Sequence, residues 1–123
     1  NAVPVIPDVT NDDWIEWAQG IWTGIRETEV LQVREARDEK DEKHIAALQL
    51  DVVDRLVRLY TNKGETVFSP FAGIGTEGYQ AILRGRKFIG VELKESYWKV
   101  ACDNLRTAVR KTREGELFSD ETQ

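Results

Sequence analysis

The sequence predicts an α/β fold in which a small, mostly parallel sheet is flanked by helices. Apolar patterns typical of helix and strand alternate between residues 48 and 111, in the order helix, strand, helix, strand, helix. The first strand runs into a glycine loop that contains Gly73 and Gly75, and the second ends at Glu92, 19 residues after Gly73. Such a loop and acid at the carboxyl ends of neighbouring strands are typical of a site for an adenosine-containing cofactor, the alternative being a glycine-rich turn without a ligand.

The amino-terminal part is expected to begin as an extended lead-in, because Pro4 and Pro7 disfavour helix. Thr10 and Asp13 then have the spacing of a capping box. An apolar face typical of a short helix follows, made by Trp14, Trp17, Ala18 and Ile21. We expect these tryptophans to lie in the core rather than to form a ligand cage. Residues 29–33 could form a strand, and the mixed charges of residues 34–43 favour a mobile loop.

The later helices are read from their apolar faces. The clearest helix covers residues 48–60, and its predicted buried face consists of Leu48, Val52, Leu56 and Leu59. A short helix that stops at Gly85 joins the two strands, and a longer helix covers residues 96–111. Residues 113–123 are polar and are expected to fray.

Composition and charge limit the class of protein. With 123 residues and 41% hydrophobic content, the chain is one globular domain or part of one. Its single cysteine, Cys102, excludes an internal disulfide and a cysteine-based zinc site. The net charge of −5 argues against indiscriminate nucleic-acid binding, but residues 84–113 carry a local +6, which suits either a nucleic-acid contact or a solvated helix face. Without a signal peptide or a long apolar run, we expect a cytoplasmic protein with no membrane contact.

Several ordered motifs resemble a known family. Residues 69–76 (SPFAGIGT), preceded by residues 44–55 (HIAALQLDVVDR) and followed by residues 85–93 (GRKFIGVEL) and Tyr97, resemble the cofactor half of S-adenosylmethionine-dependent DNA methyltransferases that act on exocyclic amines of adenine or cytosine. Residues 22–28 (WTGIRET) and 33–37 (VREAR) resemble the stretch before that half in phage and prophage members. The resemblance implies a Rossmann-like methyltransferase fold in the permuted order, S-adenosylmethionine as cofactor, DNA as partner and a role of the restriction-modification type.

The resemblance also implies a set of cofactor-binding residues: His44, Leu48, Gln49, Ser69, Phe71, Ala72, Gly73, Gly75, Thr76 and Glu92. Ser69 stands where an acid more often binds the methionine amino group, and Glu92 would take the ribose hydroxyls. His44 belongs to the segment that would close over the methionine carboxylate. On this basis the chain divides into a lead-in (1–13), a methyltransferase cofactor-binding domain (14–111) and a polar tail (112–123).

The catalytic loop of this family is missing. It would carry two consecutive prolines, whereas the prolines here are Pro4, Pro7 and Pro70. We therefore identify no catalytic residue and expect the chain alone to be inactive, with an upstream catalytic half supplied in cis or in trans. An open sheet edge would then bind that half or lead to self-association. Two alternatives stay open, namely an NAD or FAD dinucleotide-binding module and a non-catalytic S-adenosylmethionine-binding remnant.

Overall fold

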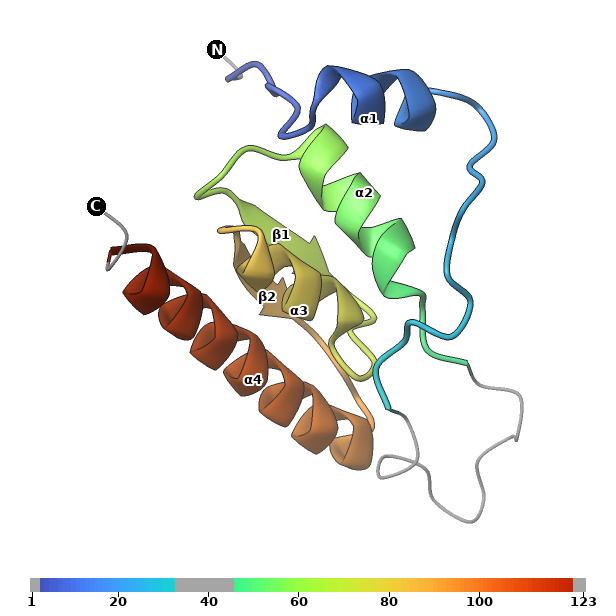
Figure 1. Ribbon diagram of the computed structural model, residues 1–123. Coiled ribbons are helices and arrows are strands. Elements are labelled where there is room, and N and C mark those ends of the chain that lie inside the picture. The colour runs from blue at the N-terminus through green and yellow to red at the C-terminus, as the bar shows by residue number, and fades with distance from the viewer. Residues whose placement is uncertain (1–2, 33–45, 121–123) are drawn as a thin grey trace.

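The computed structural model describes residues 3–32 and 46–120, with the backbone alone from residue 117 onward. Its elements follow one another as α1 (Asn11–Trp17), α2 (Leu50–Tyr60), β1 (Thr66–Ser69), α3 (Thr76–Leu83), β2 (Lys87–Gly90) and α4 (Glu95–Asp120) (Figure 1). The predicted α/β fold with a small parallel sheet is therefore confirmed.

The sheet consists of β1 and β2, which pair in parallel with Thr66 opposite Lys87 and Ser69 opposite Gly90. The connection through α3 is a βαβ unit, and α3 contacts both strands, α2 and α4. Figure 1 shows α3 in front of the strands with α2 and α4 on either side, so the three helices form one layer. The opposite face of the sheet carries the neighbouring pair Phe68 and Ile89, which are 60% and 58% exposed. Among the described residues, the helices thus cover one face of the sheet and leave the other face exposed.

The core lies between the helix layer and the sheet. Val53 and Val57 of α2 pack with Ala81 of α3, and Val67 of β1 lies against this cluster. A side chain on Gly78 would collide with Phe88 of β2 and Leu105 of α4. The glycine therefore lets α3 approach both neighbours closely.

A buried arginine fastens the lead-in to this core. The Arg86 side chain is 0% exposed; it donates hydrogen bonds to the Asp8 carboxylate at 3.0 Å and to the carbonyl oxygen of Thr61 at 2.6 Å. The bond from Arg86 lowers the pKa of the Asp8 carboxyl group below its ordinary value. In addition, Asp8 N–H donates to the carbonyl of Arg58 at 2.9 Å. The lead-in is consequently part of the folded unit.

The predicted capping box at the start of α1 is present, since Thr10 Oγ1 accepts from Asp13 N–H and Asp13 accepts from Thr10 N–H. The predicted core position of the α1 apolar face was wrong, because none of the helix is buried and Trp14 is exposed. Trp17 is covered instead by guanidinium groups, with Arg55 and Arg58 at 5.1 and 4.9 Å from its ring centroid. Periodicity alone did not distinguish an apolar partner from a cationic one.

Other predictions need correction at particular residues. The helix predicted for residues 48–60 begins only at Leu50, so Leu48 precedes it and is exposed. Leu56 is exposed as well, and Val53 and Val57 are buried in its place because α2 contacts α3 through them. The helix predicted for residues 96–111 continues to Asp120 as α4, since Arg113, Glu114 and Glu116 are good helix formers. Within the described part of residues 29–33, only an isolated antiparallel bridge from Val30 to Gln49 forms. The loop predicted for residues 34–43 lies outside the described residues.

Candidate cofactor site

The glycine loop joins the carboxyl end of β1 to the first turn of α3. Gly73 and Gly75 have left-handed backbones, with φ of +55° and +84°. A side chain on Gly75 would come within 3.2 Å of Ala101 of α4, whereas the position of a side chain on Gly73 is open space. Asn104 of α4 also donates to the carbonyl of Ile74 at 2.8 Å. The loop is therefore held from behind by α4 and open at Gly73.

Glu92 lies just after β2 and reaches the same loop. Its Oε2 accepts from Gly73 N–H at 2.8 Å, and its Oε1 accepts from Lys94 N–H at 2.8 Å. A carboxylate has about four acceptor positions, so capacity remains for further donors such as hydroxyl groups. Glu92 therefore also fixes the backbone of the glycine loop, a contact that its sequence position did not predict.

A pocket of about 140 Å³ opens over the loop. Five of the predicted site residues line it, namely Leu48, Phe71, Ala72, Gly73 and Thr76. Five further residues line it that the prediction missed, namely Ala46, Ala47, Ile74, Glu77 and Tyr97. Tyr97 belongs to the motifs that carry the family resemblance but was not assigned to the site. Glu77 and Tyr97 share a signal that could have identified them, since each lies in the first turn of the helix that follows a strand.

Two features of this pocket suit a bound ligand. The ring of Phe71 is 86% exposed, although apolar side chains are usually covered. The Tyr97 hydroxyl is buried yet has no hydrogen-bond partner among the residues that the structure describes. Both groups therefore lack the contacts that a ligand would supply.

The remaining predicted residues lie elsewhere. Ser69 is 5% exposed at the end of β1, and its Oγ donates a long hydrogen bond of 3.5 Å to Glu77 Oε1. Gly75 faces Ala101, as described above, and Gln49 immediately precedes α2. His44 lies outside the described residues, so its assignment stays a prediction.

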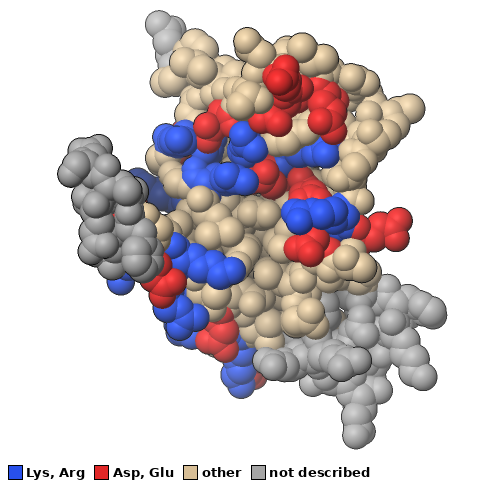
Figure 2. Space-filling model, in the orientation of Figure 1, with Lys and Arg blue, Asp and Glu red and all other residues tan. Residues whose placement is uncertain are grey.

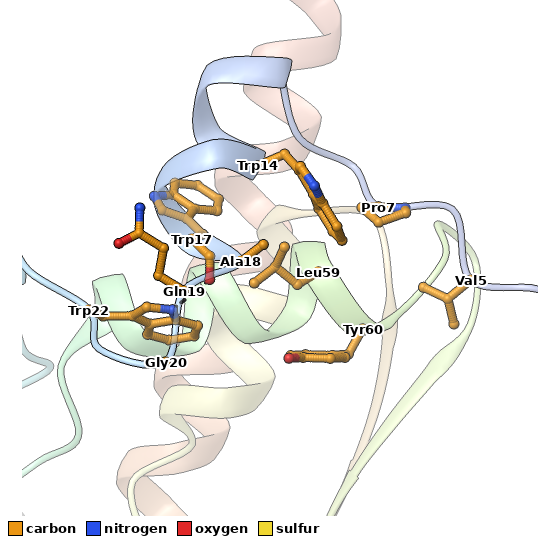
Figure 3. A pocket seen from close by; sticks show the side chains of 10 residues that line it. All are labelled: Val5, Pro7, Trp14, Trp17, Ala18, Gln19, Gly20, Trp22, Leu59 and Tyr60. Atoms are coloured by element: carbon orange, nitrogen blue, oxygen red, sulfur yellow. Dashed lines mark hydrogen bonds between the residues drawn. The ribbon is translucent and has the colours of Figure 1, made fainter.

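A second pocket, of about 870 Å³, lies between the lead-in, α1 and the end of α2. Figure 3 shows Trp14, Trp17 and Trp22 around it, together with Tyr60. The described residues that line it are aromatic, aliphatic or small apart from Gln19, and none of them is charged. Leu59 and Tyr60 lie at the carboxyl end of α2, whereas Leu48, which lines the pocket over the glycine loop, precedes its amino end, so the two pockets lie at opposite ends of this helix.

On the face of the molecule that Figure 2 shows, charged groups of the described residues are intermixed rather than gathered by sign. Within the basic stretch of residues 84–113, Arg86 is buried, and Lys99 and Arg106 pair with Glu95 and Asp103 at 2.8 Å. Glu95 and Asp103 are already counted in the local +6, so that excess is reduced instead by the pairs of Arg84 with Asp54 and of Arg86 with Asp8, two acids outside the stretch. Among the described residues, no helix combines the length and apolarity needed to cross a membrane.

A parallel strand pair, a left-handed glycine loop and an acid after the second strand define an α/β cofactor-binding unit. A family profile described as DNA methylase matches residues 8–103. The chain belongs to this family. The predicted resemblance to DNA methyltransferases is thereby confirmed and favoured over a dinucleotide-binding module; the phage origin stays a prediction.

Individual relatives agree with the family. The chain is 33% identical over 100 residues to the type II methyltransferase M.BglI of Bacillus subtilis, covering 80% of this chain and 26% of that protein. It is 38% identical over 77 residues to the DNA adenine methyltransferase YhdJ of Escherichia coli (strain K12), and this match covers 63% of this chain and 26% of that protein. The chain spans about a quarter of the length of these curated relatives.

A solved structure has the same fold. A DNA modification methylase from Thermus thermophilus, complexed with S-adenosyl-L-methionine, matches with a TM-score of 0.62 and 27% identity. The match covers 82% of this chain and 34% of that one. The Rossmann-like methyltransferase fold expected from the sequence is therefore confirmed for the part that this chain represents.

Proposed function

We propose that this chain is the S-adenosylmethionine-binding part of a DNA methyltransferase that modifies an exocyclic amine of adenine or cytosine. The observation that carries the proposal is the glycine loop, which is open at Gly73 and tied through its N–H to Glu92. Ligands of open α/β sheets bind at such a carboxyl end of the strands. The bound cofactor would supply the methyl group.

The residues present fit that cofactor. The unpartnered Tyr97 hydroxyl and the exposed Phe71 ring offer one polar and one apolar contact at the pocket. The spare acceptor positions of Glu92 would receive ribose hydroxyls. Backbone groups around Gly73, Gly75 and Thr76 would hold the methionine end, where a helix begins and its dipole favours negative charge.

Calorimetric titration of the purified chain tests this proposal. We expect S-adenosylmethionine to bind and NAD and FAD to give no heat of binding at the same concentrations. Binding of a dinucleotide with S-adenosylmethionine inert would refute it. A location in the cytoplasm would follow from the DNA substrate.

We further propose that methyl transfer needs a catalytic half that this sequence does not contain. No pair of consecutive prolines occurs in the chain. The face with Phe68 and Ile89 is open, and each strand of the pair has one edge without a neighbour among the described residues. Such a face and such edges favour either binding of that half or self-association.

Two measurements separate these outcomes. Incubation of the chain with duplex DNA and labelled S-adenosylmethionine should transfer no label, and transfer would show that acceptors within this chain replace the missing loop. Light scattering should detect self-association that decreases when Phe68 is changed to Ser, while a strictly monomeric chain would favour the separate half.

DNA contact by the chain alone should be weak and sensitive to salt, because much of its basic stretch is paired or buried.

A further inference from the structure

We propose that the Glu77 carboxylate binds the α-ammonium group of the cofactor, and that Ser69 positions this carboxylate. The inference rests on the proposed function, since it names a contact within the same pocket. It adds a specificity-determining residue outside the set of residues that the sequence predicted.

The first observation is the place of Glu77 in the pocket. Of the residues that line it, Glu77 alone carries a charge, and the others are apolar, small or uncharged. A single carboxylate in such surroundings gives the pocket a preference for a positively charged group. The amino-acid end of S-adenosylmethionine carries an ammonium, and its sulfonium adds a second positive charge.

The second observation is that Glu77 has little else to bind. Its hydrogen bond to Ser69 is long, at 3.5 Å, and among the described residues no Lys or Arg pairs with it. Half-buried carboxylates are costly unless hydrogen bonds or a partner charge compensate for the lost water. The helix dipole at the first turn of α3 stabilises Glu77 in part, but it leaves the acceptor positions of the carboxylate free.

Glu92 provides a contrast at the other side of the loop. Both of its oxygens already accept backbone N–H groups at 2.8 Å, from Gly73 and Lys94. Glu92 is therefore committed to holding the loop and can add neutral hydroxyl donors. Glu77 has the free capacity for a full positive charge, so the two acids would recognise opposite ends of the same cofactor.

Ser69 is placed to orient Glu77. It is 5% exposed at the end of β1, where its backbone is held by the sheet, and its hydroxyl donates toward Glu77 Oε1. Ser69 is thus a positioning residue rather than a direct ligand.

Calorimetry with three related ligands tests the role of Glu77. S-Adenosylmethionine and S-adenosylhomocysteine both carry the α-ammonium, whereas methylthioadenosine lacks the amino-acid end. We expect Glu77→Gln to weaken the first two about 10-fold to 100-fold, the range for a hydrogen bond to a charged group, and to leave methylthioadenosine unchanged. Glu95→Gln is the matched control, because Glu95 also lies in a first helical turn, and it should bind all three ligands like the parent.

The outcomes are distinct. If the parent binds S-adenosylmethionine and Glu77→Gln binds it equally well, the inference is overturned and the proposed function stands. Equal weakening of methylthioadenosine would also overturn it, since Glu77 would then only support the fold of the loop. A parent chain that binds none of the three would overturn the proposed function and the inference together.

A double-mutant cycle tests Ser69. Ser69→Ala should weaken binding of S-adenosylmethionine in the parent by a smaller factor, about 3-fold to 10-fold, because Ser69 acts on the ligand only by positioning Glu77 through a long hydrogen bond of 3.5 Å. In the Glu77→Gln background the same change should have no further effect. Additive losses would show that Ser69 contacts the ligand by itself, which would refute its positioning role.

Discussion

Replacing Glu92 by Ala should affect both the folded loop and the cofactor. The change removes the acceptors of two backbone N–H groups, on Gly73 and Lys94, each bound at 2.8 Å. Hydrogen bonds to a charged group contribute about 1.5–3 kcal/mol when the freed donor stays dry. Here the loop is open at Gly73, so water can replace part of that bonding. We therefore expect a loss of about 1–2 kcal/mol in the free energy of unfolding without ligand.

Thermal melting and calorimetry measure the two effects separately. A loss of that size should lower the Tm by about 4–8 °C, because the unfolding entropy is about 2.1 cal/mol/K per residue. Affinity for S-adenosylmethionine should fall by a further 10-fold or more, about 1.5–3 kcal/mol, from the lost ribose contact. Glu114→Ala, on the exposed face of α4, is the control and should change neither quantity appreciably.

Either of two results would refute this reasoning. An unchanged Tm would mean that the two backbone bonds contribute nothing to the loop. A lowered Tm with unchanged affinity for the cofactor, measured well below the melting transition, would leave Glu92 a purely structural residue and remove it from the site.

Further predictions concern other parts of the molecule. Gly73→Val should abolish S-adenosylmethionine binding in a titration, because a branched side chain at φ +55° is strained and would enter the open space over the loop; binding as tight as the parent's would show that the loop is misassigned. Arg86→Met should cost about 1–3 kcal/mol in urea unfolding, since it leaves the carbonyl oxygen of Thr61 without its donor and the partly exposed Asp8 carboxylate without its buried partner; an unchanged free energy of unfolding would contradict the role of this pair. Hydrogen bonds from Arg26 lower the pKa of Asp51 to about 2 from 3.8, so the stability from this pair is present above about pH 4 and should be lost as the pH falls from about 4 towards 2. Arg26→Gln should flatten the Tm profile over that range, and an identical profile would contradict it.

The βαβ unit was predictable because its signals are local. Gly73 and Gly75 adopt the left-handed conformation that glycine permits, and the strands begin and end within a residue or two of the predicted positions. The capping box at Thr10 and Asp13 was recognisable for the same reason, since both partners lie within four residues of each other.

Features that depend on distant partners were not predictable. The buried face of α2 was misassigned at Leu56, because the directions from which α3 and the lead-in approach the helix are absent from its own periodicity. In the site, the bond from Gly73 to Glu92 spans 19 positions, and the contact between Ser69 and Glu77 joins a strand to a helix. The position of Glu92 predicted a contact with the ribose of the cofactor but not its hydrogen bond to the glycine loop. Glu77 was not assigned to the site, because the helix dipole already explains an acid in a first helical turn.

The ion pair between Arg86 and Asp8 makes the stability of the cofactor-binding unit depend on the start of the chain. Their bond joins positions 78 residues apart, and Arg86 lies just before β2, at the end of the strands away from the glycine loop. A fragment cut after Asp8 would leave a guanidinium group inside the protein without its counter-ion, at a cost comparable to a large share of a small domain's stability. The βαβ segment that carries the cofactor contacts therefore depends on a peptide at the far end of the sheet. Engineered transplantation of the glycine loop would have to bring that peptide along.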